Sequence, residues 1–135
     1  MRNFMSRHSL AAKVAGVAVA AATAVVVAAG TASADIWSVT TSDADPGGIA
    51  YFNSGLWRLS AVDLEADGYA VWAQSWLEDS AGNHYYITTV HTVGSASAGA
   101  DTPAFQSGTD VHFIACLRKG TDPVTYCKSR VVTIP

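Results

Sequence analysis

Cysteine, charge and long apolar runs are all scarce in this chain, and each scarcity excludes a class of protein. Two cysteines in 135 residues are too few for a disulfide-rich miniprotein or for a zinc site built mainly from thiolates. After residue 30 there is no second long apolar run, so no further membrane span is expected. The Gly-x-Ser-x-Gly motif that holds the nucleophile of many hydrolases is missing as well.

Cations are scarce too. Three of the eight Lys and Arg residues precede residue 35 (Arg2, Arg7 and Lys13), so the rest of the chain carries five cations against eleven carboxylates, a formal charge of −6. Nucleic acids and anionic lipids are bound through clustered Lys and Arg. We therefore expect no nucleic-acid partner, and no membrane association once the N-terminal segment is removed.

The N-terminal segment has the layout of a secretory signal peptide. Its three cations are followed by an Ala-, Val- and Gly-rich run over residues 14–30, and then by a small-residue cleavage site at residues 32–34. A membrane anchor is the alternative, but 17 residues are at the lower limit for crossing a bilayer, and an Ala-rich run is a weak stop-transfer signal. No paired arginines precede the run, which favours general secretion over the twin-arginine route. We expect residues 1–34 to be a signal peptide and residues 35–135 to form a single secreted, extracellular domain.

The rest of the chain consists of short β-prone segments separated by turns. Seven segments are rich in Val, Ile, Thr and aromatic residues: 36–41, 49–52, 56–64, 69–77, 84–93, 111–118 and 124–134. Residues 94–99 are rich in Gly, Ala and Ser and predict a mobile loop, and residues 101–110 predict an irregular one. No helical period with caps is present. We therefore predict an all-β fold, an antiparallel β-sandwich of about seven strands rather than a small barrel.

Both cysteines lie in the last pair of predicted strands. Residues 119–123 between these strands favour a turn, and folding the chain back about Thr121 and Asp122 places Cys116 opposite Cys127. Such a pair is close enough to bridge when it occupies a non-hydrogen-bonded position of adjacent strands. Two cysteines in an exported protein typically form one disulfide, so we expect a Cys116–Cys127 bond that closes this hairpin.

Three short motifs stand out: Asp-Pro-Gly-Gly at residues 45–48, Asp-Leu-Glu-Ala-Asp-Gly-Tyr at residues 63–69, and the closing Cys116-Leu117 and Cys127. Together they resemble a group of small secreted actinobacterial proteins that has no assigned activity. The resemblance covers nearly all of residues 35–135, and its turn and disulfide motifs imply a fold rather than a function. Many members of the group carry a second cysteine pair, with one cysteine at the position of Val62. The resemblance thus implies that this chain lacks that second bond and has a freer loop over residues 93–104.

Histidine chemistry finds no support in the sequence. The histidines after residue 35 are His84, His91 and His112, and no spacing links them to a Ser and an Asp as a catalytic triad or to one another as a metal site. A single histidine in a strand is usually a surface or half-buried residue. We therefore expect neither a catalytic nor a metal-binding histidine.

Carboxylates come in pairs, but ordinary turns explain them. Asp43/Asp45 and Asp63/Asp67 could supply oxygens to calcium, yet neither stretch has the full twelve-residue calcium-loop pattern, and Asp before Pro-Gly is a common turn opening. A glycosidase pair needs a cleft that so small a domain rarely builds. We therefore expect no metal, no cofactor and no enzymatic activity.

A row of aromatic residues is the feature most suggestive of a ligand site. Trp72 and Trp76 are four residues apart in one predicted strand, so they share a face, and Gln74 lies between them. On an outer sheet face this row could stack on sugar rings or bind a protein, with Gln74 supplying a hydrogen bond. The alternative is that the tryptophans belong to the core, because large aromatic residues are mostly well buried.

These observations favour a small exported, non-catalytic β-domain that binds protein or carbohydrate, or belongs to the cell envelope. The alternative is a secreted protease inhibitor or a small hydrolase. In an inhibitor, the disulfide-flanked loop would present Arg118 and Lys119 to a trypsin-like pocket. The sequence carries no signal for a particular ligand or oligomeric state.

We predict that the exported protein begins at Asp35, because the small residues at positions 32 and 34 fit the requirements of signal peptidase. N-terminal sequencing of secreted protein tests this directly. Secreted material that begins at Met1 would contradict it.

Overall fold

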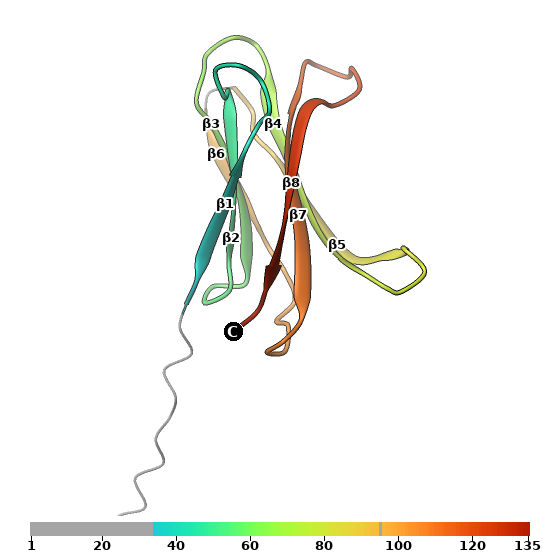
Figure 1. Cartoon of the computed structure of the whole chain (residues 1–135). Coiled ribbons are helices and arrows are strands. Elements are labelled where there is room, and N and C mark those ends of the chain that lie inside the picture. The colour runs from blue at the N-terminus through green and yellow to red at the C-terminus, as the bar shows by residue number, and fades with distance from the viewer. Residues whose placement is uncertain (1–33, 95) are drawn as a thin grey trace, which may run out of the picture. The chain divides into compact units, whose positions relative to one another are not determined.

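A computed structural model describes residues 34–94 and 96–135, and every regular element in this part is a β-strand (Figure 1). The predicted signal peptide lies outside the described residues except for Ala34. In the described part, no helix is long and apolar enough to cross a membrane. The strands are β1 (Ile36–Thr40), β2 (Gly48–Asn53), β3 (Arg58–Asp63), β4 (Ala70–Glu78), β5 (His84–His91), β6 (Ser97–Asp101), β7 (Asp110–Arg118) and β8 (Thr125–Thr133).

The strands form two antiparallel sheets that pack face to face (Figure 1). Sheet A has the order β1-β2-β3-β6 and sheet B the order β5-β4-β7-β8. Across the sandwich, β2 lies against β7, β3 against β4, and β6 against β5. The predicted all-β antiparallel sandwich is confirmed.

One face of each sheet is apolar because side chains alternate between the two faces of a strand. In β2 every second residue is buried, and in β4 the alternate residues from Val71 to Leu77 are buried while those between them are half-buried. Phe52 of sheet A and Phe113 of sheet B meet in the centre with ring centroids 6.2 Å apart. Full burial of each ring contributes roughly 1.5–3 kcal/mol to stability.

About seven strands were predicted, and β6 is the additional one among the described residues. This strand lies where the sequence predicted loops, and it pairs with β3 at the edge of sheet A. Its small residues have a packing role: Ala98 and Ala100 lie against the core, and Gly99 leaves room for Arg58. A Cβ at Gly99 would lie only 2.6 Å from Arg58 Nε. A glycine that is typical of a loop therefore makes room here for the Arg58 side chain over an edge strand.

The edge strand β8 is tied to sheet A by two contacts. Arg130 Nη1 donates a hydrogen bond to the Ser38 carbonyl (3.0 Å), and the Ser42 N–H donates to the Tyr126 carbonyl (2.9 Å). Arg130 and Lys128 are the register partners of the buried Phe113 and Ala115, respectively. Both cationic side chains therefore extend from the core-facing side of β8. Inward charges on an edge strand oppose pairing with another chain.

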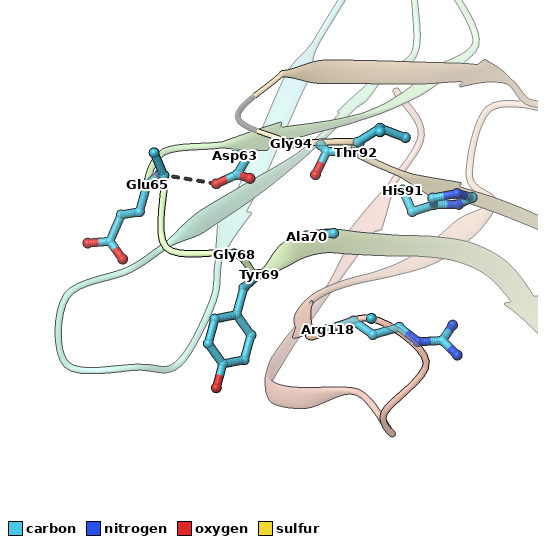
Figure 2. A pocket seen from close by; sticks show the side chains of 12 residues that line it. Asp63, Glu65, Gly68, Tyr69, Ala70, His91, Thr92, Gly94 and Arg118 are labelled. Atoms are coloured by element: carbon cyan, nitrogen blue, oxygen red, sulfur yellow. Dashed lines mark hydrogen bonds between the residues drawn. The ribbon is translucent and has the colours of Figure 1, made fainter.

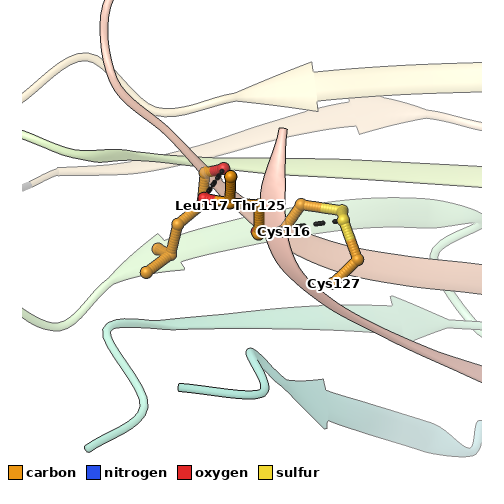
Figure 3. The surroundings of a disulfide bond; sticks show 4 residues. All are labelled: Cys116, Leu117, Thr125 and Cys127. Atoms are coloured by element: carbon orange, nitrogen blue, oxygen red, sulfur yellow. Dashed lines mark hydrogen bonds between the residues drawn. A yellow bond between two sulfur atoms is a disulfide. The ribbon is translucent and has the colours of Figure 1, made fainter. Parts of the chain in front are cut away.

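Cys116 and Cys127 form the expected disulfide between β7 and β8 (Figure 3). Their Cα atoms are 4.1 Å apart, the close spacing of a non-hydrogen-bonded pair. The Ala115↔Lys128 register leads directly to this pair, and Tyr126, with φ 51°, is the extra residue of a bulge that follows it. A disulfide is typical of an oxidising, extracellular environment.

Replacing Cys116 and Cys127 together with alanine is expected to lower the free energy of unfolding by about 3 kcal/mol or less, because the bond closes only a short loop. Alanine leaves no polar group at the buried Cys116 position. Urea unfolding followed by far-UV circular dichroism measures the change, and reduced wild-type protein is the control. An unchanged midpoint, or loss of the β-sheet spectrum, would contradict the expectation.

Candidate functional site

The tryptophan row of β4 lies on the outer face of sheet B. Trp72, Gln74 and Trp76 are half-buried there, while the core side of the strand carries Val71 and its alternate neighbours. Gln74 Nε2 donates a hydrogen bond to Thr89 Oγ1 on β5 (3.0 Å). The amide is therefore oriented by a neighbouring strand within the face.

Trp76 is held between two histidines. Its ring stacks on His84 of β5 (centroids 4.8 Å apart, planes 26° apart) and on His112 of β7 (5.5 Å, 24°). Glu78 Oε2 lies 3.5 Å from His84 Nε2 and 4.0 Å from His112 Nδ1. The two imidazoles come from the strands on either side of β4, so they cover both faces of the indole. The buried Trp76 Nε1 has no hydrogen-bond partner among the described residues.

Trp72, at the other end of the row, borders a pocket. This pocket of about 260 Å³ is also lined by Ala70, His91, Arg118, Gly120 and Thr121. His91 and Cys116 are the register partners of Trp72 on β5 and β7, so the imidazole and the disulfide flank the indole on the same outer face.

The Trp72 pocket continues into a larger one at the end of the sandwich. The larger pocket has a volume of about 510 Å³ and shares Ala70, His91, Arg118 and Gly120 with it (Figure 2). We call the two together the end groove. Its walls are the loop between β3 and β4, the residues after β5, and the hairpin between β7 and β8, and these walls contribute Asp63, Glu65, Gly68, Tyr69, Thr92, Val93 and Gly94.

Short-range hydrogen bonds shape the wall between β3 and β4. The Asp63 carboxylate accepts the Glu65 N–H (3.1 Å), and the Asp67 carboxylate accepts the Tyr69 N–H (2.9 Å). Each is an Asx turn, in which the Asp side chain accepts a hydrogen bond from the backbone N–H two residues later. Gly68 has φ 84°, which a side chain would strain. The turn chemistry of the sequence therefore positions Tyr69 and Glu65 at the groove.

The opposite wall carries the cations. Arg118 Nε donates to the Asp122 carbonyl (2.9 Å) and Nη2 to the Thr121 carbonyl (3.4 Å). Lys119 Nζ lies 5.6 Å from the centre of the Tyr69 ring, a cation–π distance that joins the two walls. Figure 2 shows the Arg118 and His91 side chains pointing to the same side, away from Glu65.

Carboxylates gather at the outer end of the groove. Partial burial of Glu65, together with the negative charges of Asp45, Asp67 and Asp43, raises the pKa of that carboxyl. Burial acts in the same sense on Asp43, but hydrogen bonds from Thr41 and Gly47 outweigh it and lower its pKa. Throughout the described residues, no three His, Cys, Asp or Glu side chains form a group that could hold a metal ion.

The sequence pointed to only part of this site. Trp72, Gln74 and Trp76 all lie on the outer face of sheet B, but of the three only Trp72 lines the end groove. From the sequence, His91 was a candidate only for catalysis or metal binding, and Arg118 only for contact with a protease. Arg118 comes beside Trp72 through the pairing of β4 with β7, two strands distant in sequence, so no local signal shows it. His91 comes from the next strand, β5, whose hairpin with β4 contains a bulge that shifts the register.

Comparison with known proteins adds no relative. No protein-family model, no curated protein and no solved structure matches the chain. A functional proposal therefore rests on the residues that line the end groove.

Glu65→Gln is expected to raise the thermal midpoint at neutral pH, because the amide removes a partly buried negative charge and its repulsion with the Asp43, Asp45 and Asp67 carboxylates. A carboxyl whose pKa is raised by folding destabilises the folded state once the pH passes its ordinary pKa, and the penalty is complete above the raised pKa. Below both pKa values Glu65 is neutral, so wild type and variant should converge at about pH 3.

Differential scanning calorimetry across this pH range tests the expectation. Asp122→Asn removes a carboxylate outside the cluster and should not raise the midpoint. A Glu65→Gln effect that is the same at every pH would show that the charge of Glu65 is not its cause.

Proposed function

We propose that this domain is a secreted, non-catalytic binding module that holds a saccharide in the end groove. The observation that carries the proposal is the position of Trp72, an indole at the border of a groove lined by polar side chains. A sugar ring presents an apolar face of C–H groups and a rim of hydroxyls. An aromatic ring covers the apolar face at little entropic cost, and fixed polar groups select the hydroxyls.

The polar groups beside Trp72 suit hydroxyl recognition. Arg118 and His91 supply N–H donors, and Thr121 and Glu65 supply oxygen acceptors on the walls. Volumes of about 260 and 510 Å³ are of the order that holds one or a few sugar units. A saccharide is therefore a better match to this groove than a flat protein surface, the other ligand class that the sequence favoured.

A non-catalytic role is proposed because the groove contains no assembled acid–base or nucleophilic pair. Among the hydrogen bonds and ion pairs of residues 34–94 and 96–135, none joins His91 to a carboxylate or a hydroxyl. Asp63 directs one carboxylate oxygen to the backbone of its own turn. General acid–base catalysis needs such groups within hydrogen-bond reach of one another or of the substrate.

Protease inhibition is the alternative from the sequence, and the cationic loop gives it less support. A trypsin-like pocket needs a freely projecting Arg or Lys. Arg118 is held back by the carbonyls of its own hairpin, and Lys119 extends over Tyr69. The same contacts instead fix Arg118 at the groove and Lys119 over the ring of Tyr69, which lines it.

Secretion and family membership belong to the same proposal. The hairpin disulfide supports an oxidising compartment. The signal-peptide layout of residues 1–34 supports export, and the turn and disulfide motifs support membership in the small secreted proteins of actinobacteria.

Trp72→Ala is expected to weaken saccharide binding about tenfold or more, because it removes the stacking surface while the core side of β4 stays intact. A glycan array identifies ligands, and isothermal titration calorimetry measures their affinity for wild type and variant. Trp57→Phe is the control, since Trp57 packs edge-on against Phe105 away from the groove. If no glycan binds, or if Trp72→Ala binds as tightly as wild type, the proposed function is wrong.

A further inference from the structure

We infer that the saccharide bound in the end groove is acidic, with a carboxylate that Arg118 holds. This inference rests on the proposed function and names its ligand class, a saccharide containing uronic acid or a similar carboxylated sugar. It follows from the contacts of Arg118, the charge of the Trp72 pocket and the direction of the neighbouring side chains.

Arg118 is fixed in place without being neutralised. Its Nε and Nη2 donate to the carbonyls of Asp122 and Thr121, so the guanidinium is oriented by neutral acceptors. Within the described part of the chain, no carboxylate lies within ion-pair distance of Arg118, whereas Arg58 is paired with Asp101 at 2.8 Å. A guanidinium oriented in advance loses little entropy when it binds an anion with its remaining donors.

The surroundings of Arg118 favour a negative group at the same place. The Trp72 pocket is lined by Arg118 and His91 but by no Asp or Glu. Lys119 adds a second positive charge from the same hairpin. The carboxylates Asp63 and Glu65 line the larger pocket, and Figure 2 shows Glu65 pointing away from Arg118. The charges therefore orient a ligand, with its carboxylate at Arg118 and its uncharged hydroxyls toward Glu65.

A carboxylate is the anion that we infer at Arg118, although a sulfate can accept the same pair of donors. The planar guanidinium presents parallel N–H donors that match the two oxygens of a carboxylate, which gives directional as well as electrostatic selection. Trp72 beside the pocket would cover the ring that carries this group. Shared charge alone would also admit sulfated sugars, so the experiment must separate the two anions.

The test uses a glycan array with neutral, carboxylated and sulfated members, followed by calorimetry with a matched pair. The pair is an oligogalacturonate and its methyl ester, which share a backbone but differ in charge. Carboxylated members should dominate the array, and the free acid should bind about tenfold or more tightly than the ester. If galacturonate is not among the array ligands, the carboxylated ligand found there and its methyl ester replace this pair.

Variants locate the effect. Arg118→Gln should reduce the affinity for the acid to that for the ester, and Arg118→Lys should restore it only in part, because lysine keeps the charge without the planar donors. Arg58→Gln removes a cation from sheet A and should leave the acid-to-ester ratio unchanged. Circular dichroism and the unfolding midpoint show whether each variant is folded. Weakening of acid and ester by the same factor in folded Arg118→Gln would overturn the inference.

The outcomes separate the two proposals. Neutral or esterified saccharides that bind as tightly as acids, with binding lost in Trp72→Ala, would overturn the acidic ligand and leave the saccharide-binding function standing. Equal binding of sulfated members would overturn the selection of a carboxylate. An array without any ligand would overturn both proposals.

Discussion

The pairing of β4 with β7 is the interaction on which the rest of this domain depends. These two strands form the centre of sheet B, and their inner side chains meet sheet A in the core. Side chains alternate along a strand, so a slip of one residue would turn the outer row into the core and expose the apolar face. The same register sets the functional face, and its pairs run from Ala70↔Arg118 through Trp72↔Cys116 to Trp76↔His112.

The two ends of the outer face differ because their neighbours differ. At one end, histidines from both flanking strands cover Trp76, and at the other the strands give way to loops that leave a groove beside Trp72. The cations of that end come from the β7–β8 hairpin and its carboxylates from the loops of sheet A. A domain with a strong net negative charge thus presents a locally cationic pocket, since the field at a site follows nearby charges more than the total.

Local chemistry in the sequence was enough to predict much of this fold. Segments rich in β-prone residues predicted seven of the eight strands in the described part of the chain, but they left open which side of β4 faces the core. Turn residues between two strands predicted the hairpin, and the hairpin in turn predicted the disulfide. The sequence did not predict β6, because Gly99 is explained by Arg58 of another strand and the two alanines by packing against the core, and no local pattern reveals either contact.

The sequence by itself therefore determined seven of the strands and the covalent bond, since each follows from β-prone composition, turn preference or the spacing of two cysteines. It also placed Trp72 and Trp76 on one face. Only the tertiary structure decided that Trp76 is enclosed by histidines while Trp72 borders a groove beside Arg118 and His91. His84 and His91 arrive from the next strand, β5, through a hairpin whose register is shifted by a bulge. Arg118 and His112 arrive through β7, a strand far away in the chain, and that pairing is set by the packing of the whole sandwich rather than by local preference.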